Sequence, residues 1–314
     1  MGFLNRFRGG PAVPEWASFY KPAEYEAFIA TLDADLRRRG LAFEHHDGIL
    51  EVQAGGETPD QIGILNLAQR CRMVDRSDWP AVIAEHLSSL LSLTGRDLDA
   101  LAADFEQVRE ILRIRLYADE SMGGMTPEPE GPVLRPLATG ILLGLVYDFP
   151  DSVASVSDGQ LGEWPLAEDD VLTIARANTL AERPPARQTV PGADGSTFEG
   201  MMGESFYVAS RVLGLRALIP ADNVSGALVG VPNRHVLLWH PIVDLRAVSA
   251  MTTMASVIQK MFRDGPGSIS NQLYWWKNDA LIHLPITPNR KGFDFAPPDA
   301  FVELLNGLAP PPDG

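Results

Sequence analysis

Four polar residues in the second half of the chain, Tyr147, Asp148, Arg211 and His235, have the side-chain types from which enzymes build polar active sites. Tyr147 and Asp148 follow a nearly all-apolar stretch, where a buried strand is expected to emerge into a loop. Such strand ends often present ligand-binding groups. These four residues are therefore the candidate polar site, although the sequence identifies no catalytic residue among them.

Each of these residues also has a structural interpretation, which the sequence favours. Asp148 and Asp151 are placed to cap a turn around Pro150. Arg211 lies in an apolar segment, and a buried guanidinium needs a carboxylate partner, for which we expect Asp148. Ion-pair networks of this kind shift protonation just as active sites do.

Tyr274, Trp275 and Trp276 form a second candidate site, an interaction surface on a predicted hairpin that turns at Asn278-Asp279. Adjacent strand residues face opposite sides of a sheet. One indole should therefore be exposed unless a second layer covers the sheet. An exposed indole beside Tyr274 would suit contact with a partner protein or a second copy of the chain.

Several signatures of known chemistry are missing from the sequence. It contains no G-x-x-x-x-G-K-[ST], no G-x-G-x-x-G after a strand and no G-x-S-x-G. His235 and His240 are five residues apart on one expected strand and should face opposite sides, which does not suit a zinc site. We therefore expect neither a metal nor a cofactor.

The composition limits which classes of binding partner and which cellular compartment we expect. The 41 acidic and 26 basic residues give a net charge of −15, which repels nucleic acids and anionic membranes. No apolar run is long enough to span a bilayer, and residues 1–10 lack a secretory signal. Cys71 is the one cysteine, which suits a reducing compartment. We therefore expect a cytoplasmic protein that binds neither nucleic acid nor membrane.

The first half of the chain should form a hairpin among helices. The hairpin is the clearest element, because Asp47-Gly48 between two strand-like segments is a strong turn signal. The apolar spacing predicts helices at residues 22–39, 61–74 and 79–93, a short helix at 97–105, the hairpin at 41–52 and a strand at 112–117.

The second half mixes strands and helices. Residues 140–147 are almost all apolar, which predicts a strand at the centre of a sheet. We expect further strands at 227–239, 268–276 and 280–286, and helices at 168–181, 205–219, 245–262 and 298–308. Because strands and helices do not alternate steadily, an α+β fold with a mixed sheet and packed helices is favoured over a doubly wound one.

A chain of 314 residues can form one large domain or two α+β halves. The Pro- and Gly-rich stretch at 122–132 is the candidate boundary between the halves, or equally a long loop within one domain. We expect a flexible N-terminal extension at 1–20, a helical and hairpin part at 21–121, an α+β domain at 133–308 and a tail at 309–314.

Four short sequence strings occur in an order and at a spacing that resemble those of a known family. They are Y-D-F-P at 147–150, A-N-T-L at 177–180, A-S-R-V-L at 209–213 and V-P-N-R-H-V-L at 231–237. Together they resemble the YtpQ-like family of uncharacterised bacterial proteins over about residues 133–286. The resemblance implies a soluble bacterial α+β protein. It transfers no site residue, because that family has no established activity.

Two classes of function are compatible with the sequence. The first is a non-catalytic cytosolic module that binds a partner protein, a second copy of itself or a small ligand. The alternative is an enzyme with an unrecognised polar site around Asp148, Arg211 and His235. Convergence of these three side chains in a cleft would favour the enzyme, and scatter would favour the module.

Overall fold

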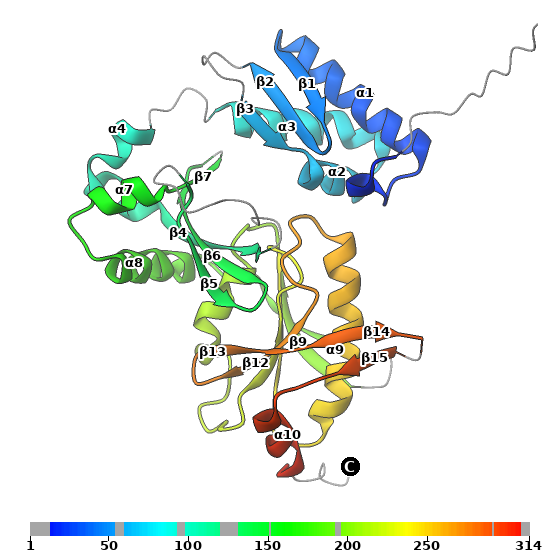
Figure 1. Cartoon of the computed structure of the whole chain (residues 1–314), viewed down its shortest axis with the longest axis vertical. Helices are drawn as coiled ribbons and strands as arrows, with labels where there is room; N and C mark the ends of the chain where they lie inside the picture. The colour runs from blue at the N-terminus through cyan, green and yellow to red at the C-terminus, as the bar shows by residue number, and fades with distance from the viewer. Residues whose placement is uncertain are drawn as a thin grey trace, which may run out of the picture. The chain divides into compact units, whose positions relative to one another are not determined.

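The computed structural model describes residues 13–53, 60–92, 98–119, 131–150, 152–191, 196–290 and 292–308. The chain has an α+β fold and divides into two compact units, residues 1–96 and 97–314, which Figure 1 shows from blue to red along the chain. The expected tail at 309–314, residues 1–12 of the expected extension and residues 122–130 of the expected boundary lie outside the described residues.

The first unit packs three helices against a small antiparallel sheet. The helices are α1 (Pro22–Arg38), α2 (Leu65–Arg72) and α3 (Trp79–Leu91), and the strands are β1 (Ala42–His46), β2 (Ile49–Gln53) and β3 (Asp60–Gly63). Single 3-10 turns, η1 (Glu15–Ala17) and η2 (Arg76–Asp78), precede α1 and α3. The buried core joins Phe28, Leu32 and Leu36 of α1 to Leu50 of β2 and Ile83 of α3.

The predicted helix at 22–39 and the predicted hairpin at 41–52 are both confirmed. β1 pairs with β2 in a register that joins His46 to Ile49 across the turn, and Gly48 takes the positive φ of 82°. Residues 61–63 were expected to be helical but belong to β3, which pairs with β2. The unpaired edge of β2 therefore overrides the local helical pattern.

The expected flexible extension at 1–20 is wrong over residues 13–20. Ala17 and Tyr20 are buried in the core of the first unit, and the Tyr20 hydroxyl donates a hydrogen bond to the carbonyl of Ala68 at 2.6 Å. Burial and this bond hold the segment against α2.

The second unit begins with short helices and a four-stranded antiparallel sheet. The strands are β4 (Leu112–Ala118), β5 (Leu134–Ala138), β6 (Ile141–Asp148) and β7 (Val153–Ser155), with β6 between β4 and β5. The central position of β6 confirms the expectation from its apolar sequence. The helical segments are α4 (Leu98–Ala102), α5 (Phe105–Val108), η3 (Arg109–Ile111), α7 (Asp158–Glu163) and α8 (Glu168–Ala181).

β4 and β6 lie on opposite sides of the expected domain boundary at 122–132, yet they pair over seven residues, from Leu112 with Tyr147 to Ala118 with Ile141. The boundary therefore falls inside one compact unit, and the division lies at Arg96 and Asp97 instead. Strand pairing between distant segments is invisible in local composition, which is why a Pro- and Gly-rich stretch was misleading.

A six-stranded antiparallel sheet forms the rest of the second unit, in the order β13-β12-β10-β11-β9-β8. Its strands are β8 (Arg187–Pro191), β9 (Thr197–Met202), β10 (Ala227–Gly230), β11 (Val236–Pro241), β12 (Leu273–Lys277) and β13 (Ala280–Leu284). Two helices, α9 (Arg246–Asp264) and α10 (Asp299–Asn306), pack their apolar residues against this sheet in one buried core. The 3-10 segment η4 (Ala209–Ala217) contacts β11, and β14 (Ile286–Asn289) pairs with β15 (Gly292–Phe295).

Two expected elements of this unit are corrected. The strand expected at 227–239 is two strands, because Pro232 lacks an N–H and the Asn233 side chain accepts from the His235 N–H at 3.0 Å, closing a turn. The helix expected at 205–219 is 3-10 from 209 to 217, with non-helical dihedrals at Gly214. The hairpin turned at Asn278-Asp279 is confirmed, with φ of 49° and 63° at these residues.

A substitution at Gly230 tests how closely α9 packs on β10. A Cβ at this position would lie 2.7 Å from Cγ1 of Ile258, and closer still to its Cδ1. Gly230→Ala should therefore lower the free energy of unfolding by ~1–3 kcal/mol in denaturant titrations. The control is Gly162→Ala in α7, where a Cβ meets nothing within 4 Å and alanine should be neutral or stabilising. Equal stability of the two variants would contradict the close packing of α9.

Candidate functional site

A group of polar side chains joins the first sheet of the second unit to η4 and to the turn before β11. We call it the polar cluster, and it consists of Arg113 and Arg115 of β4, Asp148 at the end of β6, Glu182 after α8, Tyr207, Arg211, Arg234 and His235. β4 supplies its two arginines from one face, because strand residues alternate and Leu112, Ile114 and Leu116 are buried on the other.

Asp148 is held by two partners. The buried Tyr207 hydroxyl donates to Asp148 Oδ1 at 2.8 Å, and Arg113 Nε lies 3.7 Å from Asp148 Oδ2. Burial, together with the negative charge of Asp148, raises the pKa of Tyr207 well above its ordinary value. Tyr207 is therefore a fixed hydrogen-bond donor that fastens the start of η4 to the end of β6.

The predicted ion pair between Arg211 and Asp148 is wrong. Arg211 is 8% exposed and donates from Nη2 to the backbone carbonyl of Glu182 at 2.5 Å. Glu182 caps the C-terminus of α8, where the last carbonyls lack helical donors and the helix dipole favours a cation. Burial lowers the pKa of Arg211, and the Glu182 carboxylate opposes that shift. A helix end is therefore the main partner of this guanidinium.

His235 has both ring nitrogens engaged. Nδ1 bonds to the carbonyl of Gly203 at 3.2 Å and therefore carries the proton, while Nε2 accepts from Arg234 Nε at 3.0 Å. Burial, with the neighbouring positive charge of Arg234, lowers the pKa of His235 to about 4. The imidazole is therefore neutral at pH 7 and tied into the turn before β11.

Tyr147 lies apart from the polar cluster. It is fully buried, and its hydroxyl donates to the Gln160 side chain of α7 at 3.2 Å. Adjacent residues of β6 face opposite sides of the sheet, so Tyr147 and Asp148 point in opposite directions. Of the other three expected site residues, Asp148 and Arg211 are linked through Arg113, which lies 3.6 Å from the Glu182 carboxylate. Over the described ranges, neither a hydrogen bond nor an ion pair joins Asp148, Arg211 and His235 to one another directly.

Several members of the polar cluster were missed as site residues. Arg115 lies over the rings of Tyr117 and Phe206, with its guanidinium carbon 5.1 and 5.5 Å from the ring centroids. The Nε groups of Arg113 and Arg115 are buried and have no hydrogen-bond partner in the described part of the chain. The signal available in the sequence was the alternation of β4, which places both arginines on one face.

The expected interaction surface is not exposed. Tyr274, Trp275 and Trp276 are 0%, 6% and 6% exposed. Trp275 packs edge to face on Phe301 of α10 at 5.2 Å, and on the opposite face the Tyr274 hydroxyl donates to the carbonyl of Thr139 at 2.9 Å. Layers on both sides cover this hairpin, so the predicted surface for a partner or a second copy is wrong.

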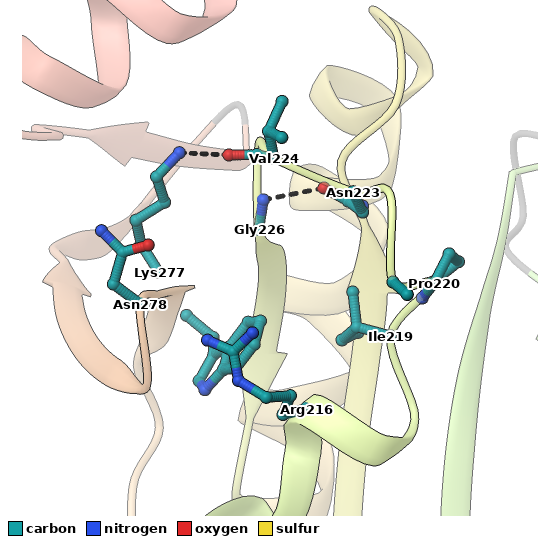
Figure 2. A pocket seen from close by; sticks show the side chains of 10 residues that line it. Arg216, Ile219, Pro220, Asn223, Val224, Gly226, Lys277 and Asn278 are labelled. Atoms are coloured by element: carbon teal, nitrogen blue, oxygen red, sulfur yellow. Dashed lines mark hydrogen bonds between the residues drawn. The ribbon is translucent and has the colours of Figure 1, made fainter.

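The second unit contains a pocket of about 260 Å³ between the end of η4 and the β12–β13 turn (Figure 2). Arg216 lies at one end, and Lys277 reaches the carbonyl of Val224 at the other. The Arg216 guanidinium lies over the ring of Trp276, which also lines the pocket. Ile219 and Pro220 form the opposite wall. None of the candidate polar residues Tyr147, Asp148, Arg211 and His235 lines it.

Comparisons with protein-family models, with curated proteins and with solved structures give no match to this chain. The resemblance to YtpQ-like proteins therefore stays a prediction. Among the described residues, no three His, Cys, Asp or Glu side chains are grouped so that they could hold a metal ion. No helix in the same ranges has both the length and the apolarity to cross a bilayer.

The lowered pKa of His235 predicts a pH dependence of stability. Between the folded value of about 4 and the unfolded value of about 6.5, the unfolded state binds more protons. The contribution of His235 is therefore complete above about pH 6.5 and is lost as the pH falls towards 4. The unfolding free energy of wild type minus that of His235→Gln should fall by about 2 kcal/mol from pH 7 to pH 4, after allowance for partial exposure. A difference that stays constant with pH would show that the imidazole is not desolvated.

Proposed function

We propose that this chain is a non-catalytic module that binds a small ligand or a partner protein. One observation carries the proposal: the side chains of the candidate polar site are already engaged in contacts that join structural elements. Asp148 accepts from Tyr207, Arg211 donates to the end of α8, and both nitrogens of His235 are bonded.

Acid–base catalysis needs a group that can exchange a proton near the working pH. The pKa of His235 is lowered to about 4, and its proton-bearing nitrogen points at the carbonyl of Gly203. Tyr207, whose pKa is raised, would also hold its proton at neutral pH. These properties suit fixed hydrogen bonds better than proton transfer.

An enzyme with a polar site around Asp148, Arg211 and His235 is the second candidate. It is favoured by Arg113 Nε, Arg115 Nε and Ser210 Oγ, which are buried and have no hydrogen-bond partner among the described residues. Buried polar groups are ordinarily satisfied, so a bound acidic substrate could supply the acceptors.

We further propose that the module works in the cytoplasm. Cys71 is fully buried, and burial raises the pKa of its thiol to about 12, which makes it a packing residue and not a reactive one. A chain with one inert cysteine and a net charge of −15 suits a reducing compartment and partners other than nucleic acid.

Native mass spectrometry of the affinity-purified protein tests the module against the enzyme. We expect wild type to show an added mass, in excess of its own 34.2 kDa, that is lost on denaturation. Asp148→Asn and His235→Gln should show the same added mass. A module keeps its ligand when these residues change. An added mass found in the two variants and missing from wild type would indicate a trapped substrate and support the enzyme. Wild type, purified at micromolar concentration and carrying only its own mass, would contradict the module.

A further inference from the structure

The pocket in Figure 2 has a charge opposite to that of the whole chain. Arg216 and Lys277 are the two charged residues among those that line it, and with Asp279, the ion-pair partner of Arg216, they leave one net positive charge, while the chain as a whole carries −15. The described chain thus gathers two cations at one concave site against its overall field. Sites of one sign in a protein of the other sign select ligands by local charge.

Both cations are held in place. Arg216 forms a two-point contact with Asp279 at 3.0 to 3.2 Å, and its guanidinium carbon lies 5.5 Å from the ring centroid of Trp276. Lys277 donates one N–H to the carbonyl of Val224, which leaves two donors on the ammonium for another acceptor. Two fixed cations at opposite ends of a pocket lose little freedom when an anion binds between them.

A third donor lies in the same wall. Asn223 Oδ1 accepts from the backbone N–H groups of Ser225 and Gly226, both at 2.9 Å, which fixes the orientation of the amide. Its Nδ2 is then left with no hydrogen-bond partner among the described residues. The apolar part of the wall comes from Ile219, Pro220 and the Trp276 ring, and Asn278 adds one more polar side chain.

We infer that this pocket binds a small organic carboxylate with an apolar body. The carboxylate lies between Arg216 and Lys277, and the apolar body packs on Trp276 and Ile219. The volume of about 260 Å³ is below that of typical pockets for drug-sized ligands, so the ligand is small. The inference deepens the proposed binding module by giving its site and the class of its ligand.

Benzoate is the probe, and the indole N–H signal of Trp276 in NMR spectra of the full chain is the readout, assigned with Trp276→Phe. We expect benzoate to shift this signal with a Kd on the order of 1 mM. Its neutral counterpart benzamide should bind at least about tenfold more weakly, because it lacks the charge. Inorganic phosphate, which lacks the apolar body, should also bind more weakly than benzoate.

Arg216→Gln and Lys277→Gln should each weaken benzoate binding about tenfold. The matched control is Arg187→Gln, because Arg187 is also exposed, pairs with Glu199 at 2.7 Å and lies 5.3 Å from the ring centroid of Trp239. It should bind benzoate as wild type does.

The inference is overturned if benzamide binds as tightly as benzoate, if phosphate binds as tightly, if both cation variants keep wild-type affinity, or if about 20 mM benzoate leaves the Trp276 signal in place. Such a failure would not contradict the proposed binding module. That proposal is tested separately by native mass spectrometry, which detects a retained ligand at any site.

Discussion

The second unit depends on one constraint: the Tyr207 hydroxyl and the Arg211 guanidinium, at and before the start of η4, are buried and need hydrogen-bond acceptors. Arg211 and Tyr207 are 8% and 4% exposed, and an unmade hydrogen bond of a buried charged group is costly. Their acceptors are the last carbonyl of α8 and the carboxylate at the end of β6. This requirement fixes η4 against the first sheet. Because η4 also contacts β11 and carries Arg216 in its last turn, the same bonds set one end of the pocket.

The polar cluster therefore resembles a catalytic site in its residue types and differs from one in its bonding. A histidine, two acidic residues and arginines lie in one region, but their hydrogen bonds run to a helix end, a turn and a tyrosine hydroxyl, and two of the arginines stack on ring faces. The pKa shifts follow from burial, and they move His235 and Tyr207 away from the range in which protons exchange at neutral pH. By contrast, the cations of the pocket are exposed to solvent along part of their length and can meet a ligand.

Local signals in the sequence predicted the local structure. Asp47-Gly48 and Asn278-Asp279 specify turns by their own backbone preferences, and both hairpins form as expected. The errors concern partners that are distant in the chain. Residues 61–63 join β2, Arg211 meets α8 in place of Asp148, and Trp275 and Trp276 are buried because layers cover both sheet faces. The pocket was missed for the same reason, since Arg216 and Lys277 are 61 residues apart and no periodicity joins them.

A double-mutant cycle tests most directly whether the polar cluster acts as a structural fastening. Unfolding free energies would be measured for Tyr207→Phe, Asp148→Ala, the double variant and wild type. The bond of 2.8 Å between these side chains predicts a coupling energy of about 1–2 kcal/mol. The matched cycle with Tyr147→Phe in place of Tyr207→Phe should give a coupling below about 0.5 kcal/mol, because Tyr147 bonds to Gln160 instead. Zero coupling between Tyr207 and Asp148 would show that their hydrogen bond does not stabilise the attachment of η4 to β6.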